Sequence, residues 1–178
     1  MPGRTIRARL VLLDADVIIE LFRQGIWDAL VSKVQVFVTP TVVKEVRFYP
    51  DPASGQRRRV DLQSYVDDSR IHLLDAEAES LDATRDACGK CLAIHPGELY
   101  SLAALKAADN ACKFCTADKA AIQALVLLDM TDRAVSMERM LGDAGVGRKQ
   151  PLARQFDDEY LQKWLRSGAV LKAGSAAL

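Results

Sequence analysis

Four acidic residues follow short apolar segments of the chain, or lie in the helix that comes next. They are Asp14, Glu45, Glu98 and Asp118. Carboxylates that converged on one pocket would repel one another unless cations neutralised them, and their hard oxygen atoms suit Mg²⁺ or Mn²⁺ better than zinc. One or two such ions can lower the pKa of a bound water and stabilise charge on a phosphodiester oxygen. The set therefore predicts phosphodiester hydrolysis at a divalent-metal site.

Each acid also has a purely structural interpretation. Asp118 could cap the helix that follows it, and the macrodipole alone favours Glu98 near a helix N-terminus. Glu45 could be a solvated surface residue. Asp14 differs because it interrupts an otherwise apolar segment, and a buried carboxylate there needs a partner or a metal. The prediction therefore depends on the four acids taken together.

The elements that would position these acids alternate between strands and helices. Short β-branched segments indicate strands at residues 9–13, 35–38, 70–74, 113–116 and 134–137. The connections are long enough for helical crossovers, so we expect an α/β fold, an α/β/α sandwich around a central, mainly parallel five-stranded sheet. In such sheets functional residues gather beyond the carboxyl ends of the strands, and the four acids fall there.

Composition limits the classes of protein that the chain can form. With 178 residues, 49% of them hydrophobic and 27% charged, it can bury a core, which excludes disordered, collagen-like and coiled-coil classes. Lys and Arg number 24, as do Asp and Glu, so contact with a polynucleotide must come from a local patch. We expect one domain over residues 1–150, and a C-terminal helix and tail over residues 151–178.

We expect a cytoplasmic protein with no membrane partner. No segment offers the uninterrupted apolar length of a membrane span. The apolar stretch near the N-terminus contains Asp14, Asp16 and Glu20, which the hydrophobic part of a signal peptide would not tolerate. The four cysteines do not suggest a disulfide framework in a chain of this size.

Four blocks of the sequence resemble the motifs of PIN-domain nucleases. LVLLDADVIIELF resembles the family's first strand with its aspartate, and VTPTVVKEV resembles the second block, with a glutamate in the helix after strand two. HPGELYSLAAL resembles the Gly-Glu form of the third block, and FCTADKAA resembles the Thr-x-Asp of the fourth. The blocks occur in the family's order and cover about residues 9–141.

The resemblance implies a PIN-like endoribonuclease that uses Mg²⁺ or Mn²⁺ and metal-activated water to hydrolyse RNA. It assigns metal-ligand and catalytic roles to Asp14, Glu45, Glu98 and Asp118. Thr116 is carried over as a contact to substrate phosphate or to a ligand. Asp16, where the family more often has Asn or Ser, is an additional candidate ligand. Many members are toxins of bacterial toxin–antitoxin pairs, so the expected partners are RNA and a small antitoxin protein.

Two further patterns concern partners. Arg57, Arg58 and Arg59 follow a segment rich in Pro, Ser and Gly, which predicts either a solvated loop or a mobile basic loop that contacts RNA phosphates. The apolar stripe of the helix around residues 156–165 predicts docking on its own domain, with a homodimer or a partner protein as the alternative.

Two rival functions remain open from the sequence. A PIN-like module could lack catalysis and serve to bind RNA or protein. The pairs Cys88-x-x-Cys91 and Cys112-x-x-Cys115 have the spacing of a zinc ribbon, although we favour small buried hydrophobic side chains. His95 could approach the acidic pocket, with a simple helix-entry residue as the favoured interpretation.

Overall fold

The computed structural model describes residues 9–89 and 92–176. The elements follow one another along the chain in this order: β1 (Leu10–Leu13), α1 (Ala15–Arg23), α2 (Trp27–Val31), β2 (Gln35–Val38), α3 (Pro40–Glu45), β3 (Phe48–Pro50), β4 (Arg57–Arg59), α4 (Leu62–Asp67), β5 (His72–Leu73), α5 (Ala78–Cys88), α6 (Pro96–Ala107), β6 (Lys113–Cys115), α7 (Lys119–Leu127), η1 (Thr131–Arg133), α8 (Met137–Ala144), η2 (Arg154–Phe156) and α9 (Asp158–Ser175).

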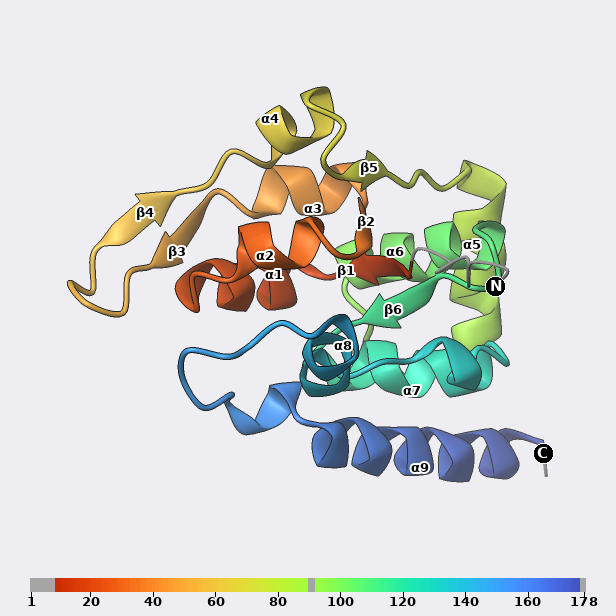
Figure 1. The fold of residues 1–178 in the computed structure, drawn as a ribbon. Coiled ribbons are helices and arrows are strands. Elements are labelled where there is room, and N and C mark those ends of the chain that lie inside the picture. The colour runs from red at the N-terminus through yellow and green to blue at the C-terminus, as the bar shows by residue number, and fades with distance from the viewer. Residues whose placement is uncertain (1–8, 90–91, 177–178) are drawn as a thin grey trace, which may run out of the picture.

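The central sheet has four parallel strands in the order β5-β2-β1-β6 (Figure 1). Val11 of β1 pairs with Val36 of β2 on one side and with Lys113 of β6 on the other. The chain therefore winds outward from β1 through β2 to β5, and then returns to β6 beside β1. At such a switch in winding direction, the loops after the two strands lead to opposite faces of the sheet, and a crevice opens at their carboxyl ends.

Helices cover both faces of the sheet, so the molecule has α/β/α layers. Along β1, Val11 and Leu13 enter one core, with α1, α2 and α8, whereas Leu12 enters a second core, with α5, α6 and α7. A parallel sheet buried on both faces requires strands that are apolar on both sides, and β1 meets this requirement. The expected α/β class with a parallel sheet is confirmed.

The predicted fifth strand at residues 134–137 is not present in the described part of the chain. Ala134 forms a single parallel bridge with Phe114 of β6. Ser136 then caps α8 by accepting a 3.1 Å hydrogen bond from the backbone N–H of Arg139. Because Met137 already belongs to that helix, the chain leaves the sheet after one bridge.

The segment from residue 48 to residue 59 is an antiparallel hairpin of β3 and β4 that projects from the body of the molecule (Figure 1). The sequence predicts a helix that opens at Pro40 and continues to about Tyr49, followed by a polar loop. The turn is exposed as expected, but the structure corrects the helix and adds two short strands. The helix ends at Glu45. Asp51 accepts a 2.9 Å hydrogen bond from the N–H of Ala53, and Gly55 at φ +68° completes the turn.

Helix α9 runs alongside α7, which belongs to the second core (Figure 1). The helix expected around residues 156–165 continues to Ser175. Lys172 donates to the carbonyl oxygen of Val126 at 3.2 Å and forms an ion pair with Asp129. The C-terminal segment therefore lies against the rest of the chain. Within the described ranges, no helix has the length and apolar character needed to cross a bilayer.

Candidate functional site

The candidate site begins with a link between the ends of two neighbouring strands. Asp14 directly follows β1, and its Oδ1 caps α1 by accepting a 2.8 Å hydrogen bond from Ala15 N–H. Its Oδ2 accepts a 2.7 Å hydrogen bond from the hydroxyl of Thr116, which directly follows β6. The Thr116 hydroxyl accepts from Asp118 N–H at 3.1 Å, and Asp118 Oδ1 caps α7 by accepting from Ala121 N–H at 2.7 Å. Thr116 thus holds the Asp14 carboxylate against the loop that carries Asp118.

Asp14 is the most buried of the predicted site acids, with 7% of its surface exposed. Burial is the main reason that its pKa is raised from 3.8 to about 6. The hydrogen bonds from Thr116 and Ala15 lower the pKa, whereas the charges of Glu98 and Asp16 raise it. A carboxyl group that titrates this close to neutrality is typical of functional sites.

Glu45 and Glu98 meet at the first turn of α6. Glu98 lies in that turn, and its Oε2 is buried with no hydrogen-bond partner among the described residues. Glu45, the last residue of α3, lies against the same turn, since a Cβ placed on Gly97 would be 3.1 Å from Glu45 Oε1. The absence of a side chain at Gly97 therefore leaves room for the Glu45 carboxylate beside the turn that carries Glu98.

The pKa shifts show that these acids share one electrostatic environment. Burial raises the pKa of Glu45, and the charge of Asp14 adds to the rise. Burial also raises the pKa of Glu98, with further contributions from the charges of Asp118 and Glu45. His95 lies close enough to lower the pKa of both glutamates. Figure 1 places the ends of β1 and β6 side by side, and we call the group next to them the acidic edge: Asp14, Asp16, Glu45, Glu98 and Asp118.

The acidic edge does not form a compact ligand set. Across the part of the chain that the structure describes, no three Asp, Glu, His or Cys side chains converge closely enough to hold a metal ion. Helix capping occupies one oxygen each of Asp14 and Asp118. The unpartnered Oε2 of Glu98 and the all-oxygen donor set nevertheless suit Mg²⁺ or Mn²⁺ in their chemistry.

A depression of about 540 Å³ borders the acidic edge at Asp16 and Asp118. Lys119, Arg154 and Tyr160 also line it, and the sequence interpretation missed all three. Lys119 could have been predicted from the sequence, because it directly follows Asp118. Arg154 in η2 and Tyr160 in α9 carry no local signal, since only the packing of the C-terminal segment brings them to this edge. Lys119 and Arg154 therefore place two cations beside the acidic edge.

The three cysteines that the structure describes lie in two separate cores. Cys115 packs in the core on the α1 face of the sheet, whereas Cys112 packs with buried Cys88 in the core on the α7 face. Cys91 lies outside the described residues. A tetrahedral zinc site needs all of its sulfurs around one ion, so this placement argues against a zinc ion shared by both cysteine pairs.

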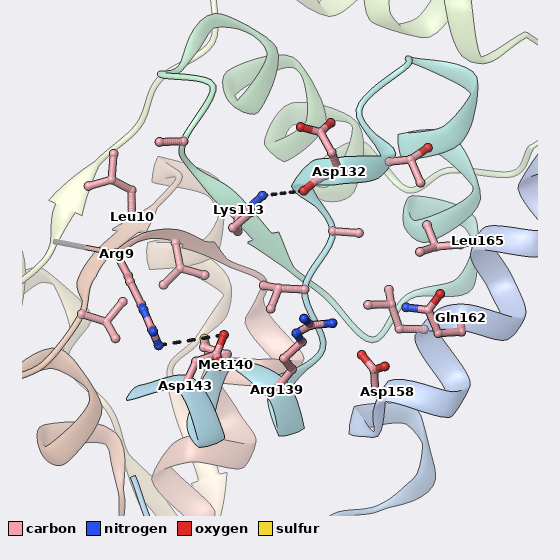
Figure 2. A pocket seen from close by; sticks show the side chains of 17 residues that line it. Arg9, Leu10, Lys113, Asp132, Arg139, Met140, Asp143, Asp158, Gln162 and Leu165 are labelled. Carbon is pink, nitrogen blue, oxygen red and sulfur yellow. Dashed lines mark hydrogen bonds and ion pairs between the residues drawn. The ribbon is translucent and has the colours of Figure 1, made fainter. Parts of the chain in front are cut away.

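A cavity of about 520 Å³ lies at the other end of the strands, where β1 begins at Leu10 and β6 begins at Lys113 (Figure 2). Its charged groups include both signs. Arg9 forms a 3.9 Å ion pair with Asp143, and Lys113 donates to the carbonyl oxygen of Asp132 at 2.5 Å. None of the residues predicted from the sequence to form the site lines this cavity, so it is separate from the acidic edge.

Comparison with known proteins does not add to this description: no family model matches the chain, and neither does any curated protein sequence.

Replacing Gly97 with Ala tests the contact at the first turn of α6. The new Cβ would lie 3.1 Å from Glu45 Oε1, so the Glu45 carboxylate must move. We expect Mn²⁺ to bind about tenfold more weakly, while stability changes little or rises by about 1 kcal/mol because Ala favours the helix. Calorimetric titration with Mn²⁺ and thermal unfolding measure the two effects. Gly142→Ala is the matched control, since a Cβ there meets nothing within 4 Å. Equal Mn²⁺ affinity in both variants would exclude Glu45 from metal binding.

Proposed function

We propose that this protein is a divalent-metal-dependent endoribonuclease of the PIN-like type, and that the acidic edge is its active site. The observation that carries the proposal is the Asp14–Thr116–Asp118 link between the carboxyl ends of β1 and β6. It supports the proposal because a buried carboxyl group with a pKa of about 6 lies where an α/β sheet of this topology binds ligands. Each of the four sequence blocks that resemble PIN-domain nucleases contributes an acidic residue to this edge.

In this proposal the residues of the acidic edge bind the metal ion and orient its ligands. Mg²⁺ or Mn²⁺ would be held by Asp14, Glu45, Glu98 and Asp118, with Asp16 as an additional ligand. When bound, such an ion neutralises carboxylate and phosphate charge and lowers the pKa of water for hydrolysis. Thr116 orients the Asp14 carboxylate through its 2.7 Å hydrogen bond.

Other groups at the edge would support the ion and the substrate. The Oε2 of Glu98 is buried without a partner in the described chain and burial raises the pKa of this carboxyl group, so a bound cation would stabilise its charged form. Lys119 and Arg154, which line the neighbouring depression, would contact the phosphates on either side of the scissile bond. A toxin role with a small antitoxin partner belongs to this proposal as its biological context.

A second candidate is a PIN-like module that binds RNA or protein without cleaving it. The observation that favours it is that no compact group of metal ligands forms within the described ranges. The same depression and the same two cations would then serve binding alone.

Cleavage of an oligoribonucleotide by the purified protein separates the two candidates. We expect cleavage with Mn²⁺ or Mg²⁺, none in EDTA, and a rate at least about 100-fold lower for Asp118→Asn. Asparagine caps a helix as well as aspartate does, so this variant keeps its fold. Asp86→Asn, on the exposed face of α5, is the matched control. Cleavage by Asp118→Asn at the wild-type rate would overturn the proposed site, and metal-independent RNA binding without any cleavage would establish the second candidate.

A further inference from the structure

The β3–β4 hairpin has two faces with different chemistry. Its antiparallel register places Phe48 opposite Arg59 and Tyr49 opposite Arg58. Opposed residues share a face of a hairpin, and successive residues alternate between faces. Phe48, Arg57 and Arg59 therefore lie on one face, and Tyr49 and Arg58 lie on the other.

The face with Tyr49 and Arg58 anchors the hairpin. The Tyr49 ring stacks with Phe22 of α1 at a centroid distance of 5.7 Å. Arg58 forms a 2.5 Å ion pair with Asp51 at the start of the turn, and the backbone hydrogen bond from Ala53 together with Arg58 keeps the pKa of Asp51 below its usual value. A two-stranded hairpin this short needs such support. Arg58 is thus a structural residue, and the contact between Tyr49 and Phe22 places the hairpin against α1.

The opposite face presents an aromatic ring and arginines to solvent. Phe48 is 41% exposed, and the guanidinium carbon of Arg57 lies 4.7 Å from its ring centroid. Arg59 is exposed and forms no ion pair within residues 9–89 and 92–176. Exposed aromatic rings beside cations are a combination that surfaces binding single-stranded nucleic acids use.

A groove of about 420 Å³ continues this face toward α3. Val43 contributes partly exposed apolar surface, and Arg47, whose Nε donates to the carbonyl oxygen of Lys44 at 2.9 Å, adds a third cation at the wall. Asp61 also lines the groove, but one of its carboxylate oxygens is engaged in capping α4 through the N–H of Ser64 at 3.2 Å. The groove thus offers apolar surface for a base and cations for the phosphates next to it.

We propose that this outer face, formed by Phe48, Arg57 and Arg59 with Arg47 at the wall of the adjoining groove, and called here the arginine platform, binds single-stranded RNA. The inference rests on the proposed function and specifies the substrate as unpaired RNA. Phe48 can stack only on a base that is not already stacked in a duplex, and arginine donates in pairs to phosphate oxygens.

The platform is close to the acidic edge along the chain. Phe48 follows Glu45 by three residues, so their Cα atoms are at most about 11 Å apart. RNA held on the platform would therefore reach the edge within a short length of strand. This proximity explains how a chain with zero net charge can hold a polyanion: the cations are gathered next to the proposed site.

Fluorescence anisotropy with a labelled oligouridylate in EDTA tests the platform without cleavage. We expect the double variant Arg57→Gln/Arg59→Gln to weaken binding about tenfold or more, and to reduce the slope of log Kd against log salt by about 1.4. Phe48→Leu should weaken binding about five- to tenfold and leave that slope unchanged. Arg85→Gln, an exposed arginine of α5, is the matched control and should change neither quantity.

The outcomes separate the platform from the nuclease proposal. Wild-type affinity and salt slope in the double variant, in a protein that cleaves RNA, would overturn the platform alone. Weakened binding in a protein that never cleaves would support the platform and reject the nuclease. Equal affinity for duplex RNA would also overturn the platform as a site for unpaired RNA. Displacement of the oligouridylate by polyglutamate at equal charge concentration would overturn it in favour of an acidic protein partner.

Discussion

Asp14→Asn is expected to reduce RNA cleavage at least about 100-fold and, in EDTA, to make the protein more stable at neutral pH. Both effects come from the same buried carboxyl group. The carboxylate would be a metal ligand in the nuclease, but without a bound cation its ionisation in a site that is 7% exposed opposes folding. A substitution that stabilises the fold while removing activity is typical of functional sites.

The sign of the pH dependence follows from the raised pKa. In the folded protein the pKa of Asp14 rises from 3.8 to about 6, chiefly through burial. The folded state therefore holds a proton that the unfolded chain releases between these values. The stability that the protonated group contributes is complete below the unfolded pKa and is lost as the pH rises through about 6, at a cost of about 3 kcal/mol. Asparagine does not ionise, so it avoids this loss.

Urea unfolding in EDTA over a range of pH measures the effect. We expect Asp14→Asn to exceed the wild type by about 1–3 kcal/mol in unfolding free energy at roughly pH 8, and the difference to vanish at roughly pH 4. Asp86→Asn should stay within about 0.5 kcal/mol of the wild type throughout. Added Mn²⁺ should stabilise the wild type and not Asp14→Asn. A variant less stable than the wild type at every pH would show that Asp14 serves the fold through its hydrogen bonds.

The fold class was predictable because the strands of the central sheet are local features of the sequence. Gln35–Val38 is a strand as predicted, and Asp14 stands out because it interrupts an apolar segment. The predicted fifth strand was wrong because Ser136 caps a helix directly after one bridge. A serine before a helical pattern can indicate such a cap, and here it outweighs the β-branched character of Val135.

The hairpin could not be predicted from local pattern. Three successive arginines do not alternate between apolar and polar, and Pro50 is a poor strand residue. Tyr49 takes its position from its contact with Phe22, which lies far back in the sequence. The same limit applies to the site: Thr116 donates to Asp14 across 102 positions of the chain, and only the resemblance to a family placed both residues together.

Gly168→Leu is expected to destabilise the protein by about 3 kcal/mol, which corresponds to a fall of about 10 °C in melting temperature. The cause is the close packing of α9 on α7. A Cβ at this position would lie 2.9 Å from Cγ2 of Val126 and 3.0 Å from the carbonyl oxygen of Gln123. The second of these atoms belongs to the backbone of α7 and cannot rotate away, so the two helices must separate.

Gly174→Leu provides the matched control in the same helix. A Cβ there meets nothing within 4 Å, so the substitution should stabilise the protein by up to about 1 kcal/mol through helix propensity. Thermal unfolding of both variants separates a packing effect from a general effect of leucine in α9. Because α9 also carries Tyr160 to the depression at Asp16 and Asp118, Gly168→Leu should lower RNA cleavage as well, and Gly174→Leu should not. Equal melting temperatures for the two variants would mean that α9 does not depend on close approach at Gly168.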